Sequence, residues 1–191
     1  MDYIKDREKI LEILREKLSG EKYEHSLETE KRAIELAGLH GADVEKAGFA
    51  GLIHDITKCM DNDALAEEYG IGATVSEKTM HQLTGAEYIR RNGITDDEEI
   101  IEAVRSHTTG ESGMTDLQKI VYLADATEPG RHFFYVDELR RASDEDLDEA
   151  MLMSLENTVK NLEKRGLPID GSTLEAYNDI KEKIKNRKRR D

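Results

Sequence analysis

The sequence predicts an all-α protein that forms one domain. Apolar residues recur at helical spacing in nearly every segment, and no stretch shows sustained period-two alternation or an internal repeat. The chain has only two prolines and 14 glycines, which argues against a loop-rich fold. A length of 191 residues allows one domain with a sizeable core and is only marginal for two. We therefore expect a single bundle of seven or eight helices.

The first two helices are predicted from apolar spacing and from the glycines that follow them. Residues 3–18 carry an apolar stripe, and Gly20 comes next as a stop signal. This stripe consists of Ile4, Ile10, Leu11, Leu14 and Leu18. Residues 24–39 show a second helical pattern, which stops at Gly41. Glycine at such a position is typical of a helix C-terminus.

Capping signals predict the helices of the middle of the chain. Asp43 is placed to cap a third helix, which carries the sequence GLIHDITK at residues 51–58. A fourth helical pattern ends at Gly93. Ser or Thr followed three residues later by Glu or Gln is typical of a capping box. This spacing occurs in the pairs Thr95–Glu98, Thr115–Gln118 and Ser172–Glu175.

The C-terminal part is predicted to contain a long amphipathic helix over residues 144–163. Its inner stripe consists of Leu147, Ala150, Met151, Ser154, Leu155, Thr158 and Leu162. Residues 181–191 carry seven basic and two acidic side chains and continue a helical pattern. Because basic residues suit a helix C-terminus, we interpret them as a solvated helix end rather than a nucleic-acid-binding arm. The predicted division is a helical domain over residues 1–180 and a basic tail over 181–191.

The charge and the composition limit the classes of function. The formal net charge is −14, and without the basic tail it is −19. An acidic body repels a nucleic-acid backbone, so polymeric DNA or RNA is not the expected substrate. No apolar run approaches 18 residues, so no membrane span is expected. Cys59 is the single cysteine and no secretory signal is recognisable, and both observations favour the cytoplasm.

Histidines and aspartates occur where the helical patterns predict burial. His25 opens the second helix, and His54 and Asp55 lie in the third. His107 and Asp125 each fall on the apolar stripe of their own helix. A lone buried histidine usually has an ordinary structural role. A carboxylate such as Asp125 is costly to bury unless a positive group meets it, and its own helix offers no evident basic partner.

A single cation would account for these positions. His25, His54, Asp55 and Asp125 together offer two nitrogen and two oxygen ligands. Such a set suits a borderline divalent metal such as iron, manganese, cobalt, nickel or zinc, and it is too rich in nitrogen for calcium. Lys58 follows Asp55 by three residues and is expected on the same side of the helix. It is therefore placed to hold a phosphate at the metal.

The ordered set of His25, His54-Asp55 and Asp125 resembles the HD-domain superfamily of metal-dependent phosphohydrolases. The His-Asp pair alone is a weak signal, but the full set over about a hundred residues is more specific. The resemblance rests on YEHSLETEKRAIELAGLHGADVEKAGFAGLIHDITK, MHQLTGAEYI, EAVRSHTTGESGMTDLQKIVYLADATEPGR and LPIDGSTLEAYN. Together they resemble the YqeK group, the symmetrical bis(5′-nucleosyl)-tetraphosphatases, over about residues 20–178. The resemblance implies an iron-dependent enzyme that cleaves diadenosine tetraphosphate into two ADP.

The resemblance also implies roles for individual residues. His25, His54, Asp55 and Asp125 match the metal ligands of the group. His81 and His107 match two further histidines that line the phosphate site and offer ligands for a second ion. Lys58 and Arg131 match basic residues that meet phosphate oxygens. A loop near the nucleotide is matched by Asp170, Gly171, Ser172, Thr173, Leu174 and Glu175.

Two positions depart from the pattern of the group. Lys22 stands where an arginine is expected before the aromatic residue, so the charge is kept but the bidentate fork is lost. We nevertheless include Lys22, together with His25, among the predicted substrate-binding residues. Gln82 and Leu83 follow His81 where small residues or proline are more usual. We expect Asp55, Lys58, His81 and His107 to carry the chemistry.

Alternative interpretations remain at this stage. An HD enzyme acting on a deoxynucleoside triphosphate or a cyclic dinucleotide would keep the metal ligands and change the nucleotide contacts. A catalytically inactive HD module would bind a nucleotide as a sensor. A purely structural helical protein would neither bind nor hydrolyse a nucleotide. Phe133 and Phe134 are candidates for stacking on a base or for a homodimer contact. Free nucleoside diphosphate is expected to bind as a product-like inhibitor.

Overall fold

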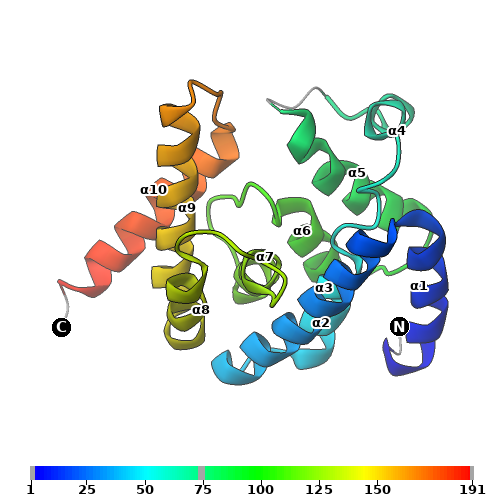
Figure 1. Cartoon of the computed structure of the whole chain (residues 1–191), viewed down its shortest axis with the longest axis horizontal. Helices are drawn as coiled ribbons and strands as arrows, with labels where there is room; N and C mark the ends of the chain where they lie inside the picture. Colours follow the sequence, from blue (N-terminus) through cyan, green and yellow to red (C-terminus); the bar gives the residue numbers. More distant parts are fainter. Residues whose placement is uncertain (1–2, 73–75, 190–191) are drawn as a thin grey trace.

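The computed structural model describes residues 3–72 and 76–189, which contain ten α-helices and no strand (Figure 1). The helices are α1 Tyr3–Lys17, α2 Gly20–His40, α3 Val44–Ile53, α4 Asn62–Tyr69, α5 Glu77–Arg91, α6 Glu98–Ser106, α7 Asp116–Thr127, α8 Val136–Glu145, α9 Leu147–Lys164 and α10 Gly171–Arg187. The predicted all-α fold is confirmed, whereas the predicted number of helices is too low. The side chain of Ile4 and residues 190–191 of the predicted tail lie outside the described residues.

The predicted helix over residues 144–163 is in fact two helices. Asp146 ends α8 and begins α9, because its extended backbone (φ −156°, ψ 112°) interrupts the helix. Its side chain accepts hydrogen bonds from the backbone N–H groups of Asp148 and Glu149. An aspartate with this geometry is a strong N-cap, so it divides an otherwise continuous apolar pattern.

Only one of the three predicted capping boxes is present. Thr115 and Gln118 form the reciprocal pair at the start of α7. The other two predictions are wrong, because Asp97 and Asp170 are the N-caps of α6 and α10. Thr95 instead accepts a hydrogen bond from the backbone of Asp97, in the turn before the helix. In both cases an aspartate two positions away satisfies the first free N–H groups.

The apolar core consists of two clusters that meet at α7. One cluster joins α1, α3, α5 and α6, and Val121 of α7 closes it. The other joins α2, α7, α8, α9 and α10, and Leu123 of α7 belongs to it. Figure 1 accordingly shows α7 near the centre, with α8–α10 on one side and α3, α5 and α6 on the other. The ends of α3, α6 and α7 therefore come together in the middle of the molecule.

A glycine allows α2 and α3 to pack unusually closely. A Cβ at Gly51 would lie 3.0 Å from Ala33 Cβ and 3.0 Å from the carbonyl oxygen of Thr29. Both distances are shorter than ordinary van der Waals contacts, so a larger residue would push the helices apart. Because His54 lies one turn after Gly51, the close packing also brings His54 towards α2.

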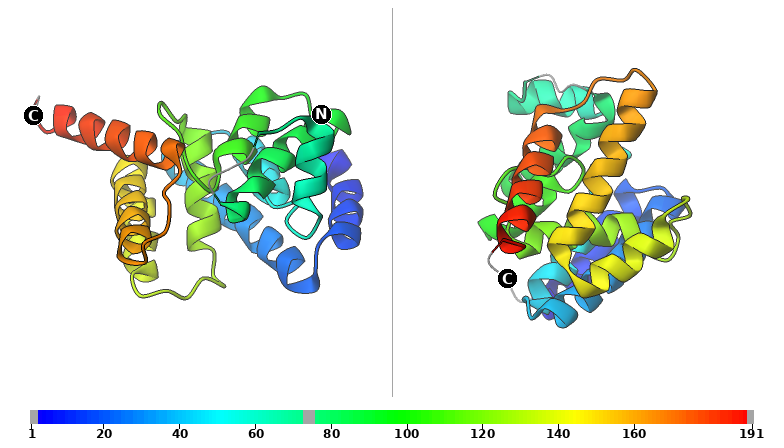
Figure 2. Two further views of the ribbon diagram at one scale, coloured as in Figure 1. Left: turned by 90° about the horizontal axis from the view of Figure 1, so that it is seen from above. Right: turned by 90° about the vertical axis from the view of Figure 1, so that its left-hand side faces the viewer.

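Buried charges join α7 to α9 and α10. Lys119 is 2% exposed, and its Nζ lies 2.8 Å from Asp148 Oδ1. Lys183 of α10 pairs with the same carboxylate at 2.9 Å. Arg187 pairs with Asp146, so α10 is held by its basic side chains where it projects beyond the rest of the chain (Figure 2). Helix α10 runs through residue 181 without a break. The division into a domain ending at residue 180 and a separate basic tail stays a prediction.

Asp148→Asn is expected to lower the free energy of unfolding by about 3 kcal/mol, because it leaves the buried Lys119 ammonium without its main partner. Burial alone would raise the pKa of Asp148, but the charges of Lys119 and Lys183 lower it by a larger amount. The pKa of Asp148 in the folded protein therefore lies below its usual value. The extra stability of wild type over Asp148→Asn is therefore complete above about pH 4. It is lost as the pH falls through the pKa that Asp148 has in the folded protein. Urea unfolding at pH 7 and at pH 3 measures both effects.

Asp116→Asn is the matched control, because Asp116 also pairs with Lys119 but its side chain is 66% exposed. We expect it to cost less than about 1 kcal/mol. If both substitutions lowered the free energy of unfolding equally, burial of the Lys119–Asp148 pair would not be the source of its stabilising effect.

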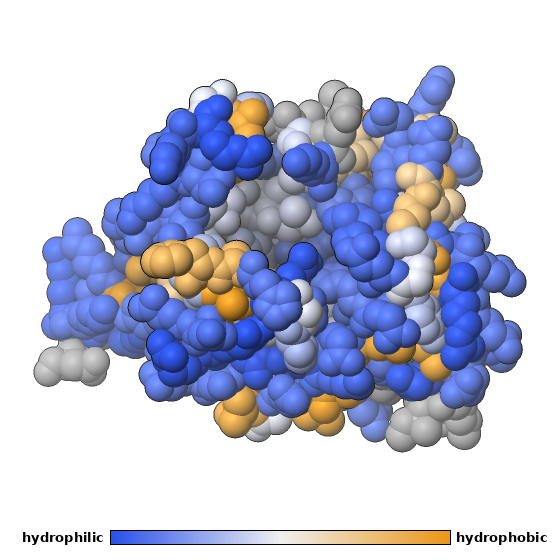
Figure 3. Space-filling model, in the orientation of Figure 1, coloured by the Kyte–Doolittle hydropathy of each residue, from blue (hydrophilic) through white to orange (hydrophobic). Residues whose placement is uncertain are grey.

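The surface of the molecule is mainly hydrophilic in the view of Figure 3, and it is hollowed near the centre of this face. Within residues 3–72 and 76–189, no helix is long and apolar enough to cross a membrane.

Candidate metal centre

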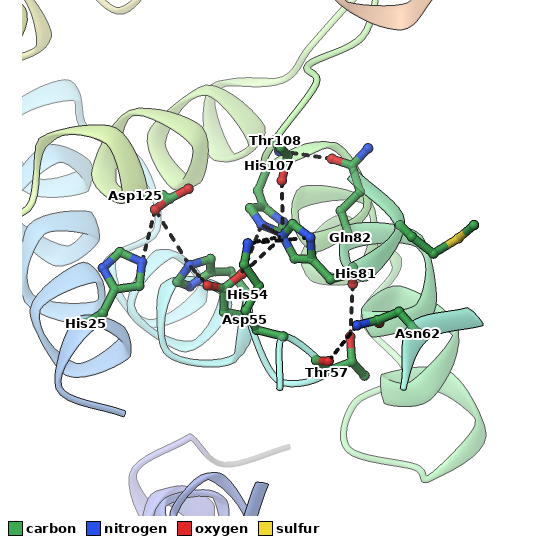
Figure 4. Close-up of polar contacts among 12 residues, drawn as sticks. His25, His54, Asp55, Thr57, Asn62, His81, Gln82, His107, Thr108 and Asp125 are labelled. Carbon is green, nitrogen blue, oxygen red and sulfur yellow. Dashed lines mark hydrogen bonds and ion pairs between the residues drawn. The ribbon is translucent and has the colours of Figure 1, made fainter. Parts of the chain in front are cut away.

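Six predicted site residues lie together at the helix ends (Figure 4). This His–Asp cluster consists of His25, His54, Asp55, His81, His107 and Asp125. Their positions are α2 for His25, α5 for His81 and α7 for Asp125, whereas His54 and His107 directly follow α3 and α6. The sequence GLIHDITK thus does not continue as one α-helix, as predicted, because α3 ends at Ile53 and the next residues form successive hydrogen-bonded turns.

One end of the cluster is formed by His25, His54 and Asp125. His25 Nε2 lies 3.0 Å from Asp125 Oδ1, and His54 Nε2 lies 3.9 Å from the same oxygen. Asp55 Oδ2 is 3.7 Å from His54 Nε2. Ligand atoms about 2.1 Å from one ion lie at most about 4.2 Å apart, so these distances suit a shared cation.

The other end of the cluster is formed by His81, His107 and Lys58. His81 Nε2 lies 3.0 Å from His107 Nε2 and 3.1 Å from Asp55 Oδ1. Lys58 Nζ lies 2.9 Å from His81 Nε2 and 3.4 Å from Asp55 Oδ1. The predicted proximity of Lys58 to Asp55 is therefore present, although the backbone between them forms turns rather than a helix.

Backbone and side-chain acceptors fix the orientation of three imidazoles. His54 Nδ1 donates to the carbonyl of Gly51 at 2.7 Å, and His107 Nδ1 donates to that of Val104 at 2.7 Å. His25 Nδ1 donates to Glu128 Oε1 at 3.1 Å. Because Nδ1 carries the proton in each case, Nε2 presents a lone pair to the centre of the cluster.

Burial and neighbouring charges shift the pKa values of His54, His81, Asp55 and Asp125. Burial lowers the pKa of His54 to about 4, so its imidazole is neutral at pH 7. Burial also lowers the pKa of His81. Burial would raise the pKa of Asp55, but the imidazoles of His54, His107 and His81 hold it well below the usual value. Burial would likewise raise the pKa of Asp125, but His25, His54 and the guanidinium of Arg131 together hold it below its usual value.

A divalent cation fits these residues. His54 Nε2 is fully buried and has no hydrogen-bond partner, and Asp55 Oδ2 lies 3.7 Å from it. An unpaired polar atom in the interior is costly, and a cation bound by His54 and Asp55 would remove that cost. Neutral imidazoles and ionised carboxylates are also the forms that ligate metal.

Arg131 and Lys22 lie at the rim of the cluster beside His25. The guanidinium of Arg131 pairs with the carboxylate of Asp125, and its Nη2 lies 3.3 Å from His25 Nε2. Arg131 thus supplies the basic partner that the helix of Asp125 lacks. Lys22 lines the same shallow cavity as Arg131, but three glutamates of α2 also line it. A contact of Lys22 with substrate stays a prediction.

A cavity of about 360 Å³ opens beside His107. We call it the inner cavity, and it lies between the starts of α5 and α10, the segment after α6, and α9. Of the predicted nucleotide loop, Asp170 and Thr173 line it. Thr108, which lines it too, has its Oγ1 3.3 Å from His81 Nε2. Leu174 and Glu175 are exposed, and Gly171, Ser172 and these two do not line the inner cavity.

Two supporting residues were not predicted from the sequence. Glu128 is 3% exposed and holds His25, and the backbone N–H of Gly130 donates to its other oxygen. Glu128 follows Asp125 by about one turn, which is the signal that could have indicated it. Gln82 accepts from the N–H groups of Thr108 and Thr109, so the unusual residue after His81 fixes the segment beside the inner cavity.

The family model of the HD domain matches residues 23–130, which contain all six cluster residues. The chain belongs to the HD domain family. Two curated proteins named symmetrical bis(5′-nucleosyl)-tetraphosphatase are similar along nearly their whole length. The one from Halalkalibacterium halodurans is 35% identical over 92% of this chain and 97% of its own. The one from Bacillus subtilis is 34% identical over 91% of this chain and 96% of its own.

A solved structure shows the same HD fold. It is described as a predicted HD superfamily hydrolase involved in NAD metabolism, from Clostridium acetobutylicum. The TM-score is 0.86 and the sequence identity is 38%, and the match covers 93% of this chain and 97% of that one. The likeness thus extends beyond the matched HD domain to α8, α9 and α10.

Proposed function

We propose that this chain is a metal-dependent hydrolase that cleaves diadenosine tetraphosphate symmetrically into two ADP. The observation that carries the proposal is the set of oriented imidazoles, whose Nε2 atoms form overlapping groups of converging ligand atoms with the buried Asp55 and the partly buried Asp125. Two relatives named for this activity align over 97% and 96% of their own length, which supports the substrate. The proposed ligand is therefore a dinucleoside polyphosphate and not a nucleic-acid polymer.

We assign the metal ligands to His25, His54, Asp55 and Asp125. Two nitrogens and two oxygens suit a divalent transition metal, and iron is our proposed occupant from the resemblance to the YqeK group. Asp55, His81 and His107 form a second set of converging ligand atoms, so we propose that a second ion can bind there. Asp55 belongs to both sets of ligand atoms.

The protein groups around the cluster are suited to phosphoryl transfer. When bound, the divalent cation polarises a phosphate oxygen and lowers the pKa of water. Lys58 and Arg131 stand at opposite ends of the cluster, where their charges stabilise the phosphoryl oxygens of the two product halves. Asp55 Oδ1 and His81 Nε2 are acceptors placed to take a proton from the attacking water.

We propose that the inner cavity holds one nucleoside. Its volume of about 360 Å³ lies within the range of about 300–1,000 Å³ that is typical of small-molecule sites. Thr108 connects it to His81, so a nucleoside in the inner cavity would direct its phosphates towards the His–Asp cluster. Thr173 and Thr158 offer hydroxyl groups to the sugar or the base. The predicted substrate contacts of Asp170 and Thr173 belong to this proposal.

The proposal is tested by turnover of diadenosine tetraphosphate with and without a chelator. We expect ADP to form and a chelator to stop its formation. Binding without any product would favour a nucleotide sensor, and neither binding nor product would leave only a structural role. Faster turnover of a deoxynucleoside triphosphate or a cyclic dinucleotide would instead assign another substrate.

Glu128→Gln is expected to weaken metal binding about 10- to 100-fold, because the carboxylate holds His25 in the tautomer that binds metal through Nε2. Competition with a chelator of known affinity measures this effect without any substrate. Glu163→Gln is the matched control on an exposed position of α9. Equal metal affinity of Glu128→Gln and wild type would exclude the positioning role.

We also propose a cytoplasmic location, from the single cysteine. We also propose that the chain can form a homodimer. Both are independent of the catalytic assignment.

A further inference from the structure

A second concave surface lies next to the inner cavity and is not used by the proposed function. This surface, the outer groove, has a volume of about 720 Å³. It is lined by Phe133, Phe134, Tyr135, Asn157, Thr158, Lys160, Asn161, Leu162 and Lys164. Thr158 and Leu162 of α9 line both the inner cavity and the outer groove, so the two sites are neighbours that share one ridge.

The chemistry of the outer groove suits a nucleoside. Phe134 has its side chain completely exposed, and Phe133 is 36% exposed and packs on Tyr135 with ring centroids 4.6 Å apart. Exposed aromatic rings are the usual platforms for stacking a base. Asn157 and Asn161 are one turn apart on α9 and offer amide groups to base or sugar.

The segment that carries Phe133 and Phe134 begins near the end of the His–Asp cluster opposite to the inner cavity. In Figure 4, His25 and Asp125 lie at one end of the cluster, and His81 and His107 lie at the other. Thr108 links the His81 end to the inner cavity. Arg131 pairs with Asp125 at the other end, two residues before Phe133 in the chain.

We propose that the outer groove binds the second nucleoside of a dinucleoside tetraphosphate, with its base stacked on Phe134. This inference rests on the proposed function. The two nucleosides would then lie at opposite ends of the cluster, and the tetraphosphate would cross it with its central bond nearest to the ligands. Symmetrical cleavage thereby follows from two nucleoside sites on either side of one reaction centre.

The kinetic test compares two substrates with the same number of phosphates. Diadenosine tetraphosphate has two nucleosides, whereas adenosine 5′-tetraphosphate has one, which would occupy the inner cavity. We expect Phe134→Ala to lower kcat/KM for diadenosine tetraphosphate about tenfold, through KM, and to leave metal content unchanged. The kcat/KM of the same variant for adenosine 5′-tetraphosphate should stay within about twofold of the wild-type value. Equal losses for both substrates, or no loss for either, would overturn the proposal.

Fluorescence provides a readout that does not require catalysis. The chain has no tryptophan and seven tyrosines, so Phe134→Trp places the single indole in the outer groove, and excitation at the long-wavelength edge of its absorption selects it over the tyrosines. Stacking of adenine on this indole should quench its emission when diadenosine tetraphosphate binds. Leu39→Trp is the control, because Leu39 is 60% exposed and does not line either site. Equal quenching in both variants, or none in Phe134→Trp, would exclude the stacked base.

These two experiments separate the failure of the inference from the failure of the proposed function. If the wild-type chain does not hydrolyse diadenosine tetraphosphate, the proposed function fails, whereas the fluorescence still tests binding in the groove. If Phe134→Ala changes only the state of association in light scattering, the groove is a contact between copies of the chain and the proposal is wrong.

Discussion

His54→Ala is expected to purify without bound metal and to hydrolyse diadenosine tetraphosphate at least about 10³-fold more slowly than wild type, a loss of about 4 kcal/mol. His54 is completely buried, and its unpaired Nε2 faces both carboxylates of the proposed ligand set. Its removal takes away a proposed metal ligand, and without the bound cation the negative charges of Asp55 and Asp125 are less well neutralised. Metal analysis of protein purified without chelator, together with initial rates, measures both effects.

Asp125→Asn provides a second variant of similar shape, in case the alanine substitution prevents folding. It should also lose metal, because the neutral amide is a weaker ligand. His40→Gln is the matched control, since His40 bonds to the carbonyl of Ser143 and lies outside the cluster. Full metal retention in both His54→Ala and Asp125→Asn would show that the ligand assignment is wrong.

Lys58→Ala is expected to keep its metal and its fold but to lose about 100-fold in kcat, or about 2.7 kcal/mol. The ammonium group lies 2.9 Å from His81 Nε2, at the end of the cluster proposed to meet phosphate oxygens. Its charge is therefore needed most as charge develops on the phosphoryl group. Steady-state kinetics on samples of matched metal content give the change in kcat.

Lys31→Ala controls for the general loss of one positive charge, because Lys31 is exposed and pairs only locally with Glu28. It should leave kcat unchanged. If Lys58→Ala had wild-type kcat at wild-type metal content, Lys58 would be an ordinary partner of Asp55 and not part of the reaction.

Local apolar patterns predicted the helical class, and the resemblance to a known family predicted that the His and Asp residues converge. Periodic apolar residues place His107 and Asp125 on inward faces, and the ordered His and Asp positions resemble a known family. The break at Asp146 was missed because the apolar stripe continues across it. Capping at Asp97 and Asp170 was missed because several polar residues before each helix have suitable spacing.

Contacts between distant segments were the part that the sequence did not predict. The carboxylate of Glu128 reaches His25 across 103 positions, and such a pair has no local signature. Gln82 was recognised as unusual, but its hydrogen bonds to the segment after His107 depend on how α5 packs. The shared ridge of Thr158 and Leu162 likewise appears only when the two concave surfaces are seen together.

The central claim is that the central phosphate bond of a dinucleoside tetraphosphate is placed over the His–Asp cluster. Chromatography of the products of diadenosine tetraphosphate hydrolysis by the metal-loaded chain, at low conversion, tests it most directly. The account predicts ADP as the sole nucleotide product, because each half retains two phosphates. Equal amounts of ATP and AMP would contradict it, even if every proposed ligand bound metal.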